Sequence, residues 1–224
     1  MDFVADDDYI TLLLNRLGRR SDTTLQGSVI DELRQAQRQL ENGRFLPWFL
    51  LTRDNTTPVY AGTQAYSSGS WDWFIRECDE APPVLIDAEG NRVKLIKGVH
   101  SVLADKYANA SQGTPKYYSL LKQTIYLWPT PAENYTFEFW FYQRQREIAI
   151  GGIVATNAWL VNASDWLLNV AGEAVAAFHL QKADMAQRFA RAASIARDNV
   201  MTLHEAREHT NMNYSDDSEY ETGT

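Results

Sequence analysis

The segment GTPKYYSLLKQTIYLWPTPAENYTFEFWFYQR, residues 113–144, carries the strongest structural pattern of this 224-residue chain. Thr124–Trp128 is typical of a strand, and the prolines at 129 and 131 end it because proline cannot donate to a sheet ladder. We expect 124–128 and 135–142 to pair as a hairpin with large side chains on both faces. Each face must then be covered by the rest of the chain or by another chain. One face is expected to hold Tyr135, Phe137, Phe139 and Phe141, and the other Thr136, Glu138, Trp140 and Tyr142.

Length and composition indicate a globular protein with one large domain or two small lobes. The net charge of −8 disfavours direct, non-specific binding to nucleic acid, which requires a basic surface. Cys78 is the only cysteine, so no disulfide can form within the chain. The acidic N-terminus is not expected to be a signal peptide, and the polar residues within 159–180 exclude a membrane span.

Apolar residues at helical spacing predict one pair of helices near each end of the chain. In the first pair, a helix ending at Gly18 is followed by one with Ser28 as N-cap and Gly43 as stop. The second pair is expected at residues 159–180 and 182–209. The expected buried stripes are Ile10, Leu13, Leu14 and Leu17; Val29, Leu33, Ala36 and Leu40; Leu167, Ala171, Ala174 and Phe178; and Met185, Phe189, Ala192, Ala196, Val200 and Leu203.

Short strand patterns fill the region between the helix pairs. Strands are expected at 59–66, 83–86 and 92–96, with a hairpin turn at 88–91 and a short helix at 99–107. The predicted fold class is therefore α+β, a four-helix bundle with an inserted, mainly antiparallel β region. The expected division is 1–45 and 157–210 for the helical bundle, 46–156 for the β-rich region, and 211–224 for a disordered acidic tail without Lys or Arg.

Residue patterns for catalysis or metal binding are weak throughout. His204 and His209 resemble the zincin motif, but their five-residue spacing turns the second ring away from the first on a helix. Cys78 stands among acidic residues, which raise a thiol pKa and oppose a nucleophilic role. We therefore expect no catalytic residue, no metal site, no cofactor and no enzymatic activity.

Exposed aromatic residues are the main candidates for contacts with other proteins. Trp71 and Trp73 follow a Ser- and Gly-rich run, where they either pack under a loop or anchor a neighbouring protein. Trp140 and Tyr142 lie on the second face of the predicted long strand, which either the strands at 59–96 or a neighbouring protein could shield. Tyr214 and Tyr220 belong to the acidic tail and complete the expected partner interface.

Several sequence features in a fixed order resemble the head-to-tail adaptor (connector) proteins of short-tailed bacteriophages. The second helix is followed by LPWFLL at 46–51, and then by the aromatic strands of the opening segment. Asn157 and Trp159-Leu160 precede the alanine-rich closing helices. The resemblance covers nearly the whole chain, and residues 59–98 match it least.

The resemblance implies a structural virion protein that joins the portal to the tail. It implies a homododecameric ring that forms part of the DNA conduit, with genomic DNA passing through without specific binding. The expected partners are the portal, towards which the C-terminal segment reaches, and tail nozzle or tail fibre proteins. Assembly is expected in the host cytoplasm, with no membrane contact. Two alternatives stay open: another neck or tail-completion protein, and a non-viral cytoplasmic interaction module.

Overall fold

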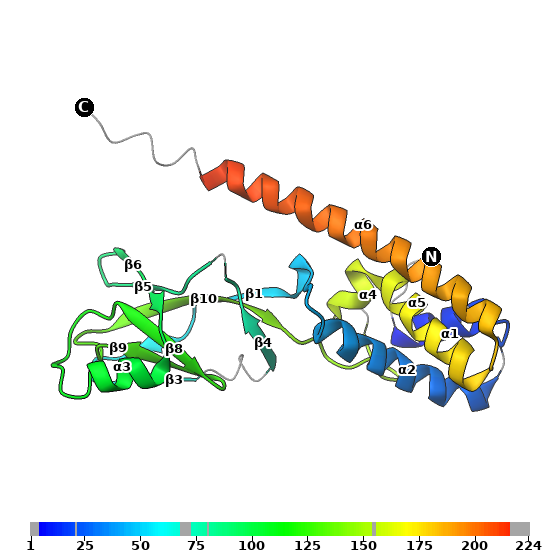
Figure 1. Ribbon diagram of the computed structural model, residues 1–224, viewed down its shortest axis with the longest axis horizontal. Coiled ribbons are helices and arrows are strands. Elements are labelled where there is room, and N and C mark those ends of the chain that lie inside the picture. Colours follow the sequence, from blue (N-terminus) through cyan, green and yellow to red (C-terminus); the bar gives the residue numbers. More distant parts are fainter. Residues whose placement is uncertain (1–4, 21, 68–72, 80, 154–155, 216–224) are drawn as a thin grey trace. The chain divides into compact units, whose positions relative to one another are not determined.

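The chain folds into two compact units. The computed structural model describes residues 5–20, 22–67, 73–79, 81–153 and 156–215, with backbone alone at 208–215. The helical unit comprises Met1–Phe49 and Gln145–Thr224, and the β unit comprises Leu50–Arg144 (Figure 1). The β unit is thus inserted between helices, with borders narrower than the predicted 46–156. The short segments 46–49 and 145–156 belong to the helical unit.

The first helices lie close to their predicted positions. Helix α1 (Asp6–Arg16) is followed by Gly18, whose φ of +69° suits glycine at a helix end. Helix α2 (Thr23–Glu41) begins five residues before the predicted Ser28 N-cap, so that prediction is wrong. The Asp22 carboxylate accepts a hydrogen bond from the Leu25 backbone N–H at 3.0 Å and caps the helix earlier.

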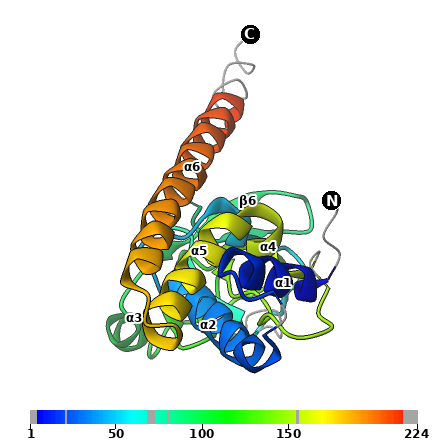
Figure 2. The ribbon, with the colours of Figure 1, turned by 90° about the vertical axis from the view of Figure 1, so that its right-hand side faces the viewer.

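The C-terminal half of the helical unit is organised around one central helix. Helix α5 (Ser164–Ala174) packs against α1, α2 and α6 (Ala183–Ser215), and the short α4 (Ala158–Asn162) precedes it (Figure 2). Helix α6 packs chiefly on α5 and on the π-helical segment η4 (Val175–His179), so the structure does not confirm a closed four-helix bundle. At Gly172, a Cβ atom would lie 2.6 Å from the Phe189 ring, which explains the close α5–α6 contact.

The π-helical segment changes which residues the closing helices bury. A π-helix adds a residue to its turn, so the predicted 4-3-4 spacing no longer keeps one face. Val175 and Ala176 are fully buried, whereas Phe178, predicted on the buried stripe, is 77% exposed. On α6, Phe189, Ala193 and Val200 are buried and Leu203 is exposed. The periodicity correctly predicts that residues 159–180 and 182–209 are largely helical, but it misses the break at Ala163 between α4 and α5 and misplaces Phe178 and Leu203.

The C-terminal segment was expected to be disordered from residue 211. Helix α6 extends to Ser215, and the disorder of the acidic tail stays a prediction. Residues 216–224 lie outside the described residues.

An irregular segment after the β unit is held by side chains of α1 and α2. The Arg146 guanidinium donates two hydrogen bonds of 2.7 Å to Asp6, which is fully buried. Gln37 donates to the carbonyls of residues 145 and 146, and Glu41 accepts from the Gln145 N–H, each at 3.1 Å. Non-regular backbone lacks ladder partners, so these polar side chains satisfy it inside the unit.

Two sheets make up the β unit. One contains β1 (Leu51–Asp54), β2 (Pro58–Val59), β4 (Phe74–Glu77), β5 (Val84–Ile86), β6 (Arg92–Lys94) and the long β10 (Tyr135–Gln143). The other contains β3 (Ala65–Tyr66), β7 (Ile96–Lys97), β8 (Tyr117–Leu121) and β9 (Thr124–Trp128). All pairs are antiparallel except β7 with β8. Helix α3 (His100–Lys106) packs on β8, and the 3₁₀ turn η1 (Trp48–Leu50) stands at the border of the unit.

The predicted hairpin of 124–128 with 135–142 is wrong. Strand β9 pairs with β8 through a turn at Lys122, whose φ is +56°, and it also pairs with β3. After β9, the carbonyls of Thr130 and Pro131 accept from Gly113 and Gly62, so the chain leaves that sheet before β10 begins. The predicted strands 59–66 and 92–96 likewise divide into pieces that join different sheets.

The alternation predicted along β10 is confirmed. Rings of Phe137, Phe139 and Phe141 are at most 1% exposed, and they face side chains from both sheets in one apolar core. Phe139 and Phe141 stack with ring centroids 5.4 Å apart. The remaining members of this core are Val59, Tyr66, Leu85, Leu95, Tyr118, Ile125, Leu127 and Tyr135.

Candidate interaction surfaces

The residues suspected of chemistry have ordinary surroundings. His204 lies edge-on to Phe45 at 5.1 Å, and Cys78 is buried. Across the described part of the chain, no three His, Cys, Asp or Glu side chains are grouped to hold a metal ion. None of the described helices combines the length and apolar character needed to cross a bilayer. Two surfaces of the described residues offer further candidates.

The outer face of β10 is the most distinctive of these surfaces. Strand pairing sets Arg53 of β1 opposite Trp140, and Arg76 of β4 opposite Tyr142. Side chains of directly paired residues share one face of a sheet. On the same face, β6 contributes two more cations, Arg92 and Lys94, through its pairing with β5. We call this the cation–aromatic face; it consists of Arg53, Arg76, Arg92, Lys94, Glu138, Trp140 and Tyr142.

Two rings of this face lie beneath arginines. The Arg53 guanidinium lies 5.7 Å from the Trp140 ring centroid, and that of Arg76 lies 5.3 Å from the Tyr142 ring centroid. Both rings are partly buried, and each arginine is exposed. Such cation–π contacts hold the charge outward over the ring. The rings therefore support the two guanidiniums on the outer face of the sheet.

Glu138 lies at the centre of the cation–aromatic face and binds two of its arginines. Its carboxylate accepts from Arg53 at 2.6 Å and from Arg92 at 2.9 Å. Burial acts to raise the pKa of Glu138, but the hydrogen bonds from Arg53 and Arg92 outweigh it, so the pKa lies below its ordinary value. Glu138 is therefore charged at neutral pH and fixes the two arginines in place.

The predicted contact residues have different positions in the structure. Trp140 and Tyr142 belong to the cation–aromatic face, whereas Trp73 is 47% exposed next to β4. Tyr214 lies within α6, and Trp71 and Tyr220 lie outside the described residues. The sequence did not suggest the four cations as a group, because they come from three strands far apart in the chain. The only signal in the sequence was the two-residue spacing of Arg92 and Lys94, which places these two of the four cations on one face of β6.

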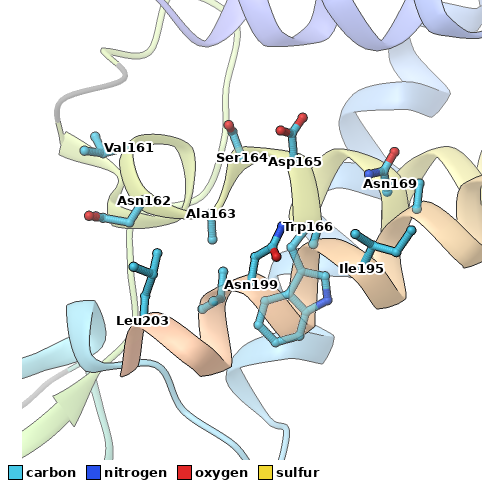
Figure 3. A pocket seen from close by; sticks show the side chains of 13 residues that line it. Val161, Asn162, Ala163, Ser164, Asp165, Trp166, Asn169, Ile195, Asn199 and Leu203 are labelled. Atoms are coloured by element: carbon cyan, nitrogen blue, oxygen red, sulfur yellow. The ribbon is translucent and has the colours of Figure 1, made fainter. Parts of the chain in front are cut away.

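A groove on the helical unit is a second candidate. It has a volume of about 370 Å³ and lies between the α4–α5 region and α6 (Figure 3). Val161, Ile195 and Leu203 line it and are 56–64% exposed, which is unusual for such apolar side chains. Asn162, Asn199 and Asp165 add polar groups, and Asp165 pairs with Arg16 at 2.8 Å. The groove is open and mixed in polarity, as protein contact surfaces commonly are.

Comparison with known proteins gives one family. The sequence model of the family described as SU10 adaptor protein matches residues 7–213, which include both units. The chain belongs to the SU10 adaptor protein family. No curated protein matches it significantly. The chain is therefore a bacteriophage structural adaptor protein, and the family implies a place in the virion with portal and tail components.

Proposed function

We propose that this protein forms a ring that joins the portal to the tail and contributes to the DNA conduit. The family match over residues 7–213 is the observation that carries the proposal. The two-unit architecture supports it, because a protein that joins two different partners benefits from two separate surfaces. The resemblance to adaptors of short-tailed phages supplies the details of the proposal. These are a ring of twelve copies, the portal bound on one side of the ring, and tail nozzle or fibre proteins bound on the other.

The distribution of charge supports a passive role toward DNA. The helical unit has 12 basic and 19 acidic residues, a net charge of −7, whereas the β unit has 9 and 10, a net charge of −1. An acidic wall repels phosphates, so a duplex passing along it does not adhere. We therefore propose that genomic DNA passes the ring without specific binding.

We further propose that the protein works without catalysis, metal or cofactor. The residues that resembled a site, His204 and Cys78, make packing contacts in the structure. Assembly in the host cytoplasm, followed by incorporation at the head–tail interface, follows from the adaptor role. A purely mechanical joint needs only complementary surfaces.

The decisive experiment is native mass spectrometry of the portal mixed with this protein. A copy number equal to that of the portal, twelve on a twelve-subunit portal, is the expected result. The control is the protein alone, for which we expect a monomer. Head-to-tail contacts close into a ring only when each subunit is rotated by the correct angle relative to the last, and we expect the portal to impose that angle. A different copy number would refute the ring. Binding to isolated tails but not to the portal would favour a tail-completion protein instead.

A further inference from the structure

The groove on the helical unit continues along α6 into a second hollow. This second hollow has a volume of about 290 Å³ and shares Asn169 and Ala192 with the groove. Arg16 and Arg188 also line it. Because they share lining residues, the two hollows form one groove, with exposed apolar side chains at one end (Figure 3) and two arginines at the other. We call it the α5–α6 groove.

The basic end of the α5–α6 groove carries an unpaired charge. Arg16 pairs with Asp165 at 2.8 Å. Arg188 is exposed and forms no ion pair with a carboxylate of the described residues. Seven residues, about 10 Å of helix, separate Arg188 from the apolar Ile195. A partner that fits this groove therefore presents an apolar group with a carboxylate beside it.

The helical unit itself presents such a group at Phe178. At 77% exposure, this ring is the most exposed large apolar side chain of the described residues. It borders a recess of about 150 Å³ together with Glu32 of α2. Glu32 is bound to His179 at 3.0 Å. Its neighbour Asp31 is 78% exposed and lies 3.6 Å from Arg34, so the Asp31 carboxylate is accessible to another protein.

The α5–α6 groove and the recess at Phe178 face in different directions. Asp165 and Asn169 of α5 line the groove, whereas Val170 and Ala174 of the same helix line the recess. The second pair follows the first by five residues, which is a rotation of about 140° around the helix. Phe178 therefore cannot fill the groove of its own copy. A surface and its complement on different sides of one molecule instead make a head-to-tail contact between copies.

We propose that Phe178 of one copy docks in the α5–α6 groove of the next copy. The inference rests on the proposed ring and names a contact that builds it. The docked phenyl ring lies against Ile195 and Leu203, and Asp31 pairs with Arg188 at the basic end.

The size of the groove agrees with this occupant. An apolar cavity of about 150 Å³ accommodates benzene, and the apolar end of the groove has a volume of about 370 Å³. A single aromatic anchor buries far less than the roughly 1,200 Å² of a stable interface. The contact is therefore weak between free copies and forms fully when the portal holds neighbouring copies side by side.

The test is cross-linking between two single-cysteine variants of the full chain. Cys78→Ser removes the native thiol, and Phe178→Cys or Ile195→Cys then places one thiol at an exposed position. The two variants are mixed on the portal and treated with a short bismaleimide. We expect a cross-linked dimer in the mixture and none from either variant alone. A variant carrying both cysteines should give a ladder of multimers, because each copy then links to both neighbours.

Loss of the anchor is a second measurement. Phe178→Ser should raise the protein concentration needed for ring assembly on the portal by about tenfold or more, as for a central aromatic anchor. Its own melting temperature should stay unchanged because the ring is exposed. The matched control is Val99→Ser in the β unit, which removes an apolar side chain of 67% exposure and should leave assembly unchanged. Arg188→Glu should weaken assembly by a smaller factor, and adding Asp31→Lys should restore part of it.

Several outcomes would overturn the proposal. Cross-linking of the Phe178→Cys variant to itself would show a two-fold contact, and cross-linking of the Ile195→Cys variant to the portal would assign the groove to a different partner. A ring of the expected copy number without cross-links in the mixture would refute this contact and leave the adaptor role intact. If no ring forms on the portal, the mixture is cross-linked alone at high protein concentration. Dimers found only in that mixture would then support the contact, and their absence would refute it.

Discussion

The β unit and the helical unit fill their interiors with different chemistry. In the β unit, the inner face of β10 presents phenylalanine rings to an apolar core formed by both sheets. In the helical unit, Asp6, Gln37, Glu41 and Asn157 are at most 2% exposed and lie among the apolar side chains. The Glu41 carboxylate there accepts from Gln37, from the Gln145 backbone and from the Trp159 indole.

Backbone geometry explains the difference. Strands satisfy their own N–H and C=O groups through ladders, so apolar side chains, both aromatic and aliphatic, can fill most of the space between two sheets. The helical unit must also bury the irregular stretch that returns from the β unit, and this stretch has no ladder. Charged and amide side chains of α1 and α2 take the place of the missing partners: the Asp6 carboxylate accepts from the Ala149 N–H, and the Gln37 amide donates to the carbonyls of residues 145 and 146. We therefore expect the stability of the β unit to fall most when a buried ring is removed. The stability of the helical unit should fall most when one partner of a buried ion pair is removed.

The largest effect expected in the helical unit comes from Arg146→Met. Asp6 would remain fully buried without its cation, and breaking a buried pair costs about 3–5 kcal/mol. Urea denaturation followed by tryptophan fluorescence measures the loss. Arg16→Met is the control, because its partner Asp165 is 70% exposed and such surface pairs contribute at most about 1 kcal/mol. Equal losses of stability for the two substitutions would show that the burial of Asp6 does not determine the cost of losing its cation.

Phe141→Ala is the corresponding test in the β unit. The ring is fully buried, and removing a buried phenylalanine typically costs about 3–5 kcal/mol. Thr136→Ala, on the exposed face of the same strand, should cost less than about 1 kcal/mol. Thermal unfolding monitored by circular dichroism measures both. A small loss at Phe141 would mean that the two sheets can close over the cavity, contrary to a tightly packed core.

Sequence patterns predicted the local structure of each segment better than they predicted which strands pair with one another. The alternation along β10 was visible because side chains point to opposite faces at every second residue. Partners of a strand have no such signature: β9 pairs with β8 and not with β10, because a turn at Lys122 brings a nearer strand into place. The cation–aromatic face was invisible for a similar reason. Arg53 and Glu138 are 85 residues apart in sequence, so no cluster of charge appears along the chain.

Gly172→Ala tests how closely the central helix packs. A Cβ atom at this position would lie 2.6 Å from the Phe189 ring, and overpacking of this kind costs about 1–3 kcal/mol. Gly27→Ala in α2 is the matched control, since a Cβ atom there would meet no other atom within 4 Å and alanine favours helix by up to about 1 kcal/mol. The two variants should shift the unfolding midpoint in opposite directions. Stabilisation by both would show that α6 moves away from α5 easily.

Glu138→Gln tests the electrostatic side of the β unit. The pKa of Glu138 is lowered in the folded protein because the arginine hydrogen bonds outweigh its burial. Its contribution is therefore fully present above the ordinary glutamate pKa and disappears as the pH falls through the lowered value. We expect a loss of about 1.5 kcal/mol at pH 7, since both arginines are half exposed. The difference between Glu138→Gln and the parent should vanish in acid; a constant difference would exclude the ion pairs as its cause.

The smallest effect on stability should come from Trp140→Ala. The ring is only partly buried, and its contact with Arg53 is worth about 0.5–1 kcal/mol, or roughly 1–4 °C in melting temperature for a chain of this size. Its main role would then be to orient positive charge on an interaction surface. The unassembled variant should keep its fold, while assembly on the portal and tail is impaired, and Trp140→Phe should restore part of that assembly by keeping a ring under Arg53. A loss of about 3–5 kcal/mol, as for a core aromatic, would place Trp140 with Phe141 and make both faces of β10 interior.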